Sequence, residues 1–170
     1  FYVGACDART GQTVYFSKSC LSRDHYDIFK GSCALPVFCK PYMVERIPCL
    51  DGGVSDPVPV LKAFEDGCDK VVLILTRPVN QKREQKKDVA PARLLARTYP
   101  KAAERLLDRY RAYNDGVEIA EEYQKIGKLL IVAPDDICGL STLSKSHEKL
   151  QKMYDKGMKD AEKIGEFLGK

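Results

Sequence analysis

Long apolar runs are missing from this sequence of 170 residues. A membrane-spanning helix needs roughly 18 consecutive apolar residues. The longest apolar stretches, 71–75 and 129–133, have the length of buried strands instead. Because 44% of the residues are apolar and 31% are charged, the composition is that of an ordinary globular protein. A chain of this length fits one domain with a sizeable core.

Paired cysteines are missing as well. The sequence contains no C-x-x-C, and its cysteines are odd in number and irregularly spaced, which argues against a disulfide framework and a structural zinc site. Most are predicted to be small buried hydrophobes in a reducing cytosol, so we expect a cytoplasmic protein without metal or cofactor. A thiol enzyme stays open as a weaker alternative. The seven cysteines are Cys6, Cys20, Cys33, Cys39, Cys49, Cys68 and Cys138.

The common nucleophile and phosphate motifs are also absent. An acyl hydrolase elbow reads G-x-S-x-G, and the nearest segments, around Ser55 and Ser141, both fail at the last position. No glycine-rich phosphate loop of either common type occurs. The two histidines, His25 and His147, are far apart and are predicted to be exposed.

The net charge of +4 is too small to imply nucleic-acid binding. Positive charge is concentrated in one polar loop, 77–89, which could contact anionic headgroups at a membrane surface. The alternative is an ordinary solvated loop. Its cations are Arg77, Lys82, Arg83, Lys86 and Lys87.

The order of strand and helix patterns predicts an α/β fold. A hairpin is expected over 1–17 with its turn at 9–12, because strand-forming residues flank a Thr-Gly turn. The apolar runs 70–76 and 128–133 read as strands covered on both faces, and a helix leads directly into the first of them. Further strands are predicted at 42–45 and in the run ending at Asp51. Helices are predicted at 22–29, 57–66, 91–98, 101–126 and from Ser146 onward, with a loop at 134–144.

Several details of these helices follow from local signals. Ser22 is the predicted N-cap of the first helix, and Asp56 that of the helix beginning at Pro57. Gly67 and Gly127 are expected to end helices. In the last helix the inward-facing residues are predicted to be Leu150, Met153, Tyr154 and Met158.

The most informative segment is Leu50-Asp51-Gly52-Gly53. It places one carboxylate on a two-glycine turn after an apolar run, and glycines permit positive φ and close approach of another group. Such a turn can present a catalytic acid or base. The alternative is an Asx turn, in which Asp51 only caps local amides.

Two ordered segments resemble bacterial patatin-like phospholipases: Ser32-Cys33-Ala34-Leu35-Pro36, and Asp51-Gly52-Gly53-Val54-Ser55-Asp56-Pro57-Val58-Pro59. The segments 69–72, 75–78, 99–100, 109–110, 113–114 and 148–150 agree with the same family, so the resemblance spans nearly the whole chain. It implies a layered patatin-like fold with a central mixed sheet flanked by helices, of which 1–170 is the C-terminal part of a single domain.

The resemblance further implies a lipid acyl hydrolase with a Ser-Asp dyad. Asp51 matches the catalytic aspartate, with Gly52 and Gly53 as its motif turn. The family's oxyanion loop and G-x-S-x-G elbow would lie upstream of this chain, so the chain alone is expected to be inactive. Expected partners are an acyl-ester substrate, the membrane surface as a peripheral contact and the missing N-terminal segment of the same protein, but not nucleic acid.

The first residue, Phe1, already belongs to a predicted strand. This start indicates either a fragment or processed product, or an arbitrary chain boundary. Without a nucleophile the chain has a second interpretation, a non-catalytic module that binds lipid surfaces or a partner chain.

Overall fold

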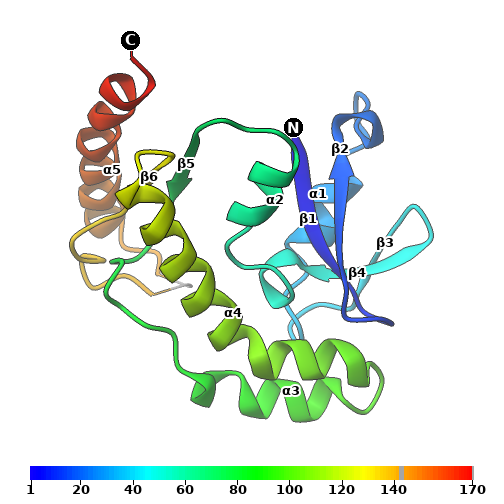
Figure 1. The fold of residues 1–170 in the computed structure, drawn as a ribbon. Coiled ribbons are helices and arrows are strands. Elements are labelled where there is room, and N and C mark those ends of the chain that lie inside the picture. Colours follow the sequence, from blue (N-terminus) through cyan, green and yellow to red (C-terminus); the bar gives the residue numbers. More distant parts are fainter. Residues whose placement is uncertain (142–143, 170) are drawn as a thin grey trace. The chain divides into compact units, whose positions relative to one another are not determined.

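The computed structural model describes residues 1–141 and 144–169 of the chain. The chain is divided into two compact units. Unit 1 comprises Phe1–Val58 and Arg83–Asp115, and unit 2 comprises Pro59–Lys82 and Gly116–Lys170. One long helix, α4 (Pro100–Lys125), contributes its first part to unit 1 and its last part to unit 2 (Figure 1).

Unit 1 is built on a four-stranded antiparallel sheet. Its strands are β1 (Tyr2–Asp7), β2 (Thr13–Ser17), β3 (Tyr42–Val44) and β4 (Ile47–Asp51), in the order β2-β1-β4-β3. The predicted hairpin over 1–17 is confirmed, and Gly11 in its turn has the positive φ that favours glycine. The pairing of Ala5 with Asp51 places the end of β4 beside β1.

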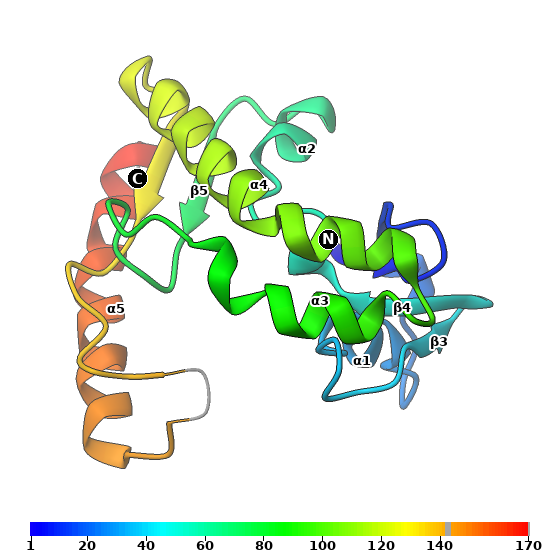
Figure 2. The same ribbon diagram turned by 90° about the horizontal axis from the view of Figure 1, so that it is seen from below.

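Each face of this sheet carries its own hydrophobic cluster, because successive strand residues point to opposite faces. Ala5, Phe16 and Cys49 pack with Ile28 of α1 (Asp27–Ser32). Cys6 and Leu50 belong to the other cluster, with residues of α3 (Val89–Leu95) and α4. Figure 2 shows α3 and the first part of α4 lying side by side. The remaining buried members of that cluster are Ala8, Val54, Ala92, Leu95, Ala102, Ala103 and Leu106.

The described residues also contain three short 3-10 helices: η1 (Lys18–Cys20), η2 (Gly52–Val54) and η3 (Gln85–Lys87). The second of these directly follows β4. It therefore forms the turn that carries the Asp-Gly-Gly segment.

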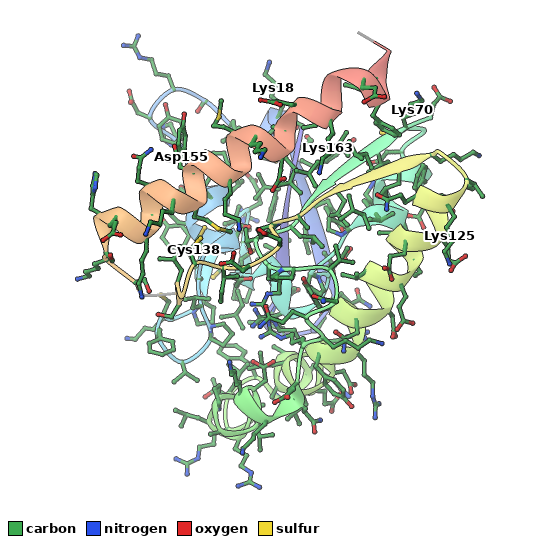
Figure 3. The ribbon with its side chains drawn as sticks, turned by 90° about the vertical axis from the view of Figure 1, so that its left-hand side faces the viewer. Lys18, Lys70, Lys125, Cys138, Asp155 and Lys163 are labelled. Atoms are coloured by element: carbon green, nitrogen blue, oxygen red, sulfur yellow. The ribbon has the colours of Figure 1, made fainter. Side chains whose placement is uncertain are left out.

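Unit 2 contains a pair of parallel strands, β5 (Val71–Ile74) and β6 (Leu129–Val132). The helix α2 (Val60–Glu65) contacts β5, and α5 (His147–Leu168) contacts β6. Figure 3 views α5 with Asp155 and Lys163 labelled along it. The rings of Phe64 and Tyr123 stack with centroids 4.2 Å apart, which joins α2 to the end of α4.

The outer edges of the two parallel strands differ. The amide of Ile131 in β6 donates to Oε1 of Gln124 at 2.7 Å. The amides of Val71 and Leu75 donate to carbonyls beside and within β6, so Val72 and Ile74 direct theirs to the other side of β5. Within residues 1–141 and 144–169 no third strand pairs there, and Ile74 is 67% exposed.

The prediction of an α/β protein is confirmed at the level of a mixed α/β architecture. The antiparallel and parallel strands form two separate sheets, whereas one mixed sheet was expected. The strand β5 was expected to be covered on both faces, but Val71, Val72 and Leu73 are only half-buried. The ends of helices α2 and α4 at Gly67 and Gly127 are as predicted, and both glycines have positive φ.

Two predicted helix starts are wrong. The first helix begins at Asp27, because Ser22 instead forms an isolated bridge with His25. The helix expected from Pro57 begins at Val60, with Pro59 in the cap position. In contrast, the last helix starts where it was predicted: α5 begins at His147, and the side chain of Ser146 caps it by accepting from the amide of Lys149. The predicted loop 134–144 includes residues 142 and 143, which lie outside the described residues.

The predicted burial of some side chains is also wrong. In α5, Leu150, Tyr154 and Met158 are exposed, and only Met153 of the four expected inward residues is half-buried. Among the cysteines, Cys6 and Cys49 are buried, Cys20 and Cys138 are intermediate, and Cys33, Cys39 and Cys68 are exposed.

Across the residues that are described, none of the helices combines the length and apolar character needed to cross a membrane.

Candidate functional site

Asp51 is the last residue of β4 and the N-cap of η2. Its amide donates to the carbonyl of Ala34 at 2.9 Å, which fixes the strand end against the segment after α1. Its Oδ1 accepts from the amide of Gly53 at 2.8 Å. The residue is half-buried. The turn is therefore an Asx-type turn, and this hydrogen bond occupies only one of the two carboxylate oxygens.

Close approach requires glycine at position 52 and leaves little room at position 53. A Cβ on Gly52 would lie 2.3 Å from the carbonyl oxygen of Gly4 in β1, and a Cβ on Gly53 would lie 3.0 Å from Oδ1 of Asp51. Neither glycine has a positive φ. The turn does not use the positive φ that glycine permits, but it does use the close approach of another group. The backbone of β1 thus presses directly against the turn.

The residues after the turn hold it to β2. Thr13 Oγ1 lies 2.8 Å from Oγ of Ser55, and the hydroxyl of Tyr15 donates to Oδ2 of Asp56. The prediction that Asp56 caps the next helix is therefore wrong. Its carboxylate accepts from Tyr15 of β2, and Pro59 is in the cap position of α2. Ser55, the serine of the rejected elbow motif, serves this contact between β2 and η2.

A charged cluster lies on the side of the turn that α4 covers. Asp88 is 6% exposed, and its carboxylate accepts from Nε and Nη2 of Arg83 at 3.1–3.3 Å. Nη1 of Arg109, in α4, is 3.9 Å from Oδ1 of Asp88. A Cβ on Gly53 would lie 4.0 Å from Nη2 of the same Arg109. Sequence reasoning missed this cluster, because the three residues share no motif or helix spacing.

The buried thiols are poor candidates for a nucleophile. Burial raises the pKa of both Cys6 and Cys49 to about 11, and the thiolate is the reactive form of cysteine. Burial also raises the pKa of Cys138, with a contribution from Asp136. At these three positions the surroundings work against a thiol enzyme.

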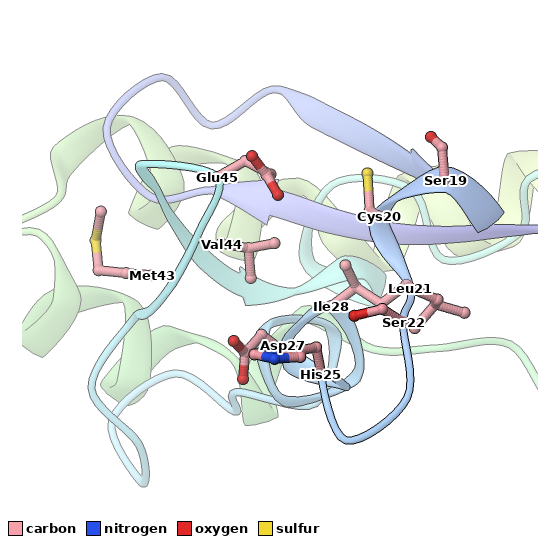
Figure 4. A pocket seen from close by; sticks show the side chains of 10 residues that line it. All are labelled: Ser19, Cys20, Leu21, Ser22, His25, Asp27, Ile28, Met43, Val44 and Glu45. Atoms are coloured by element: carbon pink, nitrogen blue, oxygen red, sulfur yellow. The ribbon is translucent and has the colours of Figure 1, made fainter.

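A separate cavity of about 330 Å³ lies elsewhere in unit 1. Figure 4 shows its lining, which comes from the segment before α1, from α1 and from the β3–β4 hairpin. His25 lies in this lining, far along the chain from His147 at the start of α5, and both histidines are exposed as predicted. Neither Asp51 nor its two glycines line this cavity. The lining residues are Ser19, Cys20, Leu21, Ser22, His25, Asp27, Ile28, Met43, Val44 and Glu45.

In the described part of the chain, no three His, Cys, Asp or Glu side chains are grouped so that they could hold a metal ion.

Two comparisons with known proteins each match less than half of the chain. Residues 99–169 match a family described as a domain of unknown function, DUF6363. The chain is also 34% identical over 79 residues to the uncharacterized protein YjjU of Escherichia coli strain K12. That match covers 46% of this chain and 22% of the relative, so the chain spans well under two thirds of the relative's length.

Proposed function

We propose that this chain carries the catalytic base of a lipid acyl hydrolase of the Ser-Asp dyad type, with the patatin-like fold that the motif order suggests. The observation that carries the proposal is the Asp51 turn. A half-buried carboxylate stands at the end of a strand on a turn whose backbone is in close contact with a second strand. Such a turn holds the side chain in one place, as a general base requires.

The proposed chemistry needs one free carboxylate oxygen. Because Gly53 occupies Oδ1, Oδ2 of Asp51 is the atom that would take the proton from a serine hydroxyl. The deprotonated serine would attack the ester carbonyl, form an acyl-enzyme and release an alcohol that receives the same proton. Water would then cleave the acyl-enzyme with Asp51 again as the base. The serine and the oxyanion donors would come from a polypeptide segment outside these 170 residues.

The hydrogen bonds of the two carboxylates favour Asp51 over Asp56 as the proposed base. The carboxylate of Asp56 is used by the hydroxyl of Tyr15, and that contact ties η2 to β2. The side chain of Asp51 instead accepts a hydrogen bond from within its own turn, from the amide of Gly53. Of the two carboxylates in the motif, Asp51 is therefore the better base.

The test is an ester-hydrolysis assay on a protein that joins this chain to its serine-bearing segment. Asp51→Asn keeps the side-chain shape and removes the base, so we expect turnover to fall by about 100-fold or more. Asp56→Asn is the matched control, because it alters a carboxylate of the same motif without removing the base. Retention of most activity by Asp51→Asn would refute the proposal. The 170-residue chain alone should show no serine-dependent turnover.

A second candidate function is a non-catalytic module that binds a lipid surface. The observation in its favour is the exposed apolar row of α5, formed by Leu150, Tyr154 and Met158. The basic loop supports it less, because Lys82 pairs with Glu118 and Arg83 pairs with Asp88. An inactive joined protein whose chain nevertheless floats with anionic vesicles would favour this second function over the first.

A further inference from the structure

The charged cluster around Asp88 is an unusual feature of unit 1, because its side chains are largely removed from water. The side chains of Arg83, Asp88 and Arg109 are 17%, 9% and 19% exposed. Burying charge is costly unless each group is paired. Arg83 and Asp88 are joined by hydrogen bonds of 3.1–3.3 Å, and Arg109 pairs with Asp88 at 3.9 Å.

The cluster is held from two directions. The main chain of Arg83 is bound at both its polar atoms by the side-chain amide of Asn114, at 2.8 and 3.1 Å. Asn114 lies in α4, as does Arg109. The loop before α3 is thus fixed to the same helix that presents Arg109, and Asp88 lies between the two arginines.

The other end of the Arg109 guanidinium points toward the Asp51 turn. A Cβ placed on Gly53 would be 4.0 Å from Nη2 of Arg109 and 3.0 Å from Oδ1 of Asp51. Nη2 of Arg109 and Oδ1 of Asp51 therefore lie within about 7 Å of each other. Charges interact over such a distance where solvent is limited. Nη1 of the same guanidinium is the atom near Asp88.

We propose that Arg109 is the positioning residue of Asp51. Its guanidinium, anchored on the buried carboxylate of Asp88, holds the Asp51 turn in place from the α4 side. This inference rests on the function proposed above only for its catalytic consequence. The structural part concerns the turn itself.

The chemistry of arginine suits this role. The guanidinium is planar and always charged, and it offers donors at both ends of a rigid fork. One end can remain at Asp88 while the other faces the turn. The ammonium of lysine is a single compact charge on a flexible stem, so it can serve only one of the two places at a time.

The first test measures the turn directly in the 170-residue chain. The Asp51 side chain accepts from the amide of Gly53, so hydrogen exchange at that amide reports whether the turn is held. In Arg109→Gln we expect exchange at Gly53 to be about tenfold faster than in the wild type, while the amides of β1 and β4 stay protected. Arg109→Lys should fall between the two.

The matched control is Arg111→Gln, from the same helix. Arg111 pairs with Asp108 on the surface, with side chains 67% and 58% exposed. Its exchange pattern should equal that of the wild type. If Arg109→Gln unfolds, Arg109→Lys becomes the deciding variant. Unchanged exchange at Gly53 in the folded variants would overturn the inference.

The second test measures catalysis in the protein that joins this chain to its serine-bearing segment. A displaced base lowers the rate of the chemical step. In Arg109→Gln we therefore expect kcat to fall by about 10- to 100-fold with KM nearly unchanged. Partial recovery of kcat is expected in Arg109→Lys. If the joined wild type hydrolyses esters and Arg109→Gln retains full kcat, the inference is overturned. If the joined wild type is inactive, the proposed function fails, and the exchange test alone decides the role of Arg109.

Discussion

Replacing Gly52 by alanine should destabilise the protein more than the same replacement at Gly53, the other glycine of the turn. The new Cβ would lie 2.3 Å from the carbonyl oxygen and 2.7 Å from the carbonyl carbon of Gly4. Both are backbone atoms of β1, and they cannot rotate away. Because real Cβ atoms stay beyond 3.0 Å, the turn and β1 must separate by about 0.7 Å.

The magnitude follows from what this separation disturbs. Overpacking of a close contact costs about 1–3 kcal/mol. The carbonyl of Gly4 also accepts a hydrogen bond from the hydroxyl of Ser32 at 2.7 Å. Disturbing one such hydrogen bond costs about 1 kcal/mol. We therefore expect the free energy of unfolding of Gly52→Ala to be about 2–4 kcal/mol lower than that of the wild type. For a chain of this size the melting temperature should fall by about 5–15 °C.

Urea denaturation followed by far-ultraviolet circular dichroism would measure this difference. Gly53→Ala is the matched control, because its Cβ would meet a side-chain atom, Oδ1 of Asp51, at 3.0 Å. That side-chain atom needs to shift by only a few tenths of an ångström, so the expected loss is below about 1 kcal/mol. The reasoning is refuted if Gly52→Ala is as stable as the wild type, or if Gly53→Ala is the less stable of the two.

Two further predictions concern buried groups. Because burial raises the pKa of Cys6 and Cys49 to about 11, iodoacetamide at pH 8 should leave both unmodified while it alkylates the exposed cysteines. Mass spectrometry of peptides checks this, and rapid labelling of Cys6 would contradict it. Asp88→Ala should lower the free energy of unfolding by about 3–5 kcal/mol, since it leaves buried arginine charge uncompensated. Glu118→Gln, at an exposed ion pair, should cost less than about 1 kcal/mol in the same urea titration, and equal losses in the two variants would contradict the reasoning.

Elements that depend on residues close to one another in the sequence could be predicted from the sequence. The hairpin of β1 and β2 needs only alternating strand residues around a turn with Gly11, and the observed register joins the two strands directly. The long helix α4 follows from apolar residues repeated at three and four positions. The Asp51 turn was also identified locally, since a carboxylate followed by two glycines already indicates close approach.

Structures that depend on distant residues could not be predicted in this way. Asp56 has the sequence of a helix cap, but Tyr15, 41 positions earlier, binds its carboxylate. Arg83 is fixed by Asn114, 31 positions later. Nothing in the local sequence distinguishes these residues from ordinary surface charges. The residue proposed to position Asp51 was therefore visible only in the folded chain.

The open side of β5 bears on how the molecule behaves in concentrated solution. An unpaired strand edge is a template for pairing with another chain. Residues 71–75 are five apolar residues in a row, a composition that favours such pairing and aggregation. The segment is bounded by Lys70 on one side and by Arg77 and Pro78 on the other. Charge and proline at such flanks act as gatekeepers against aggregation. We therefore expect Lys70, Arg77 and Pro78 to limit association of the chain through this edge.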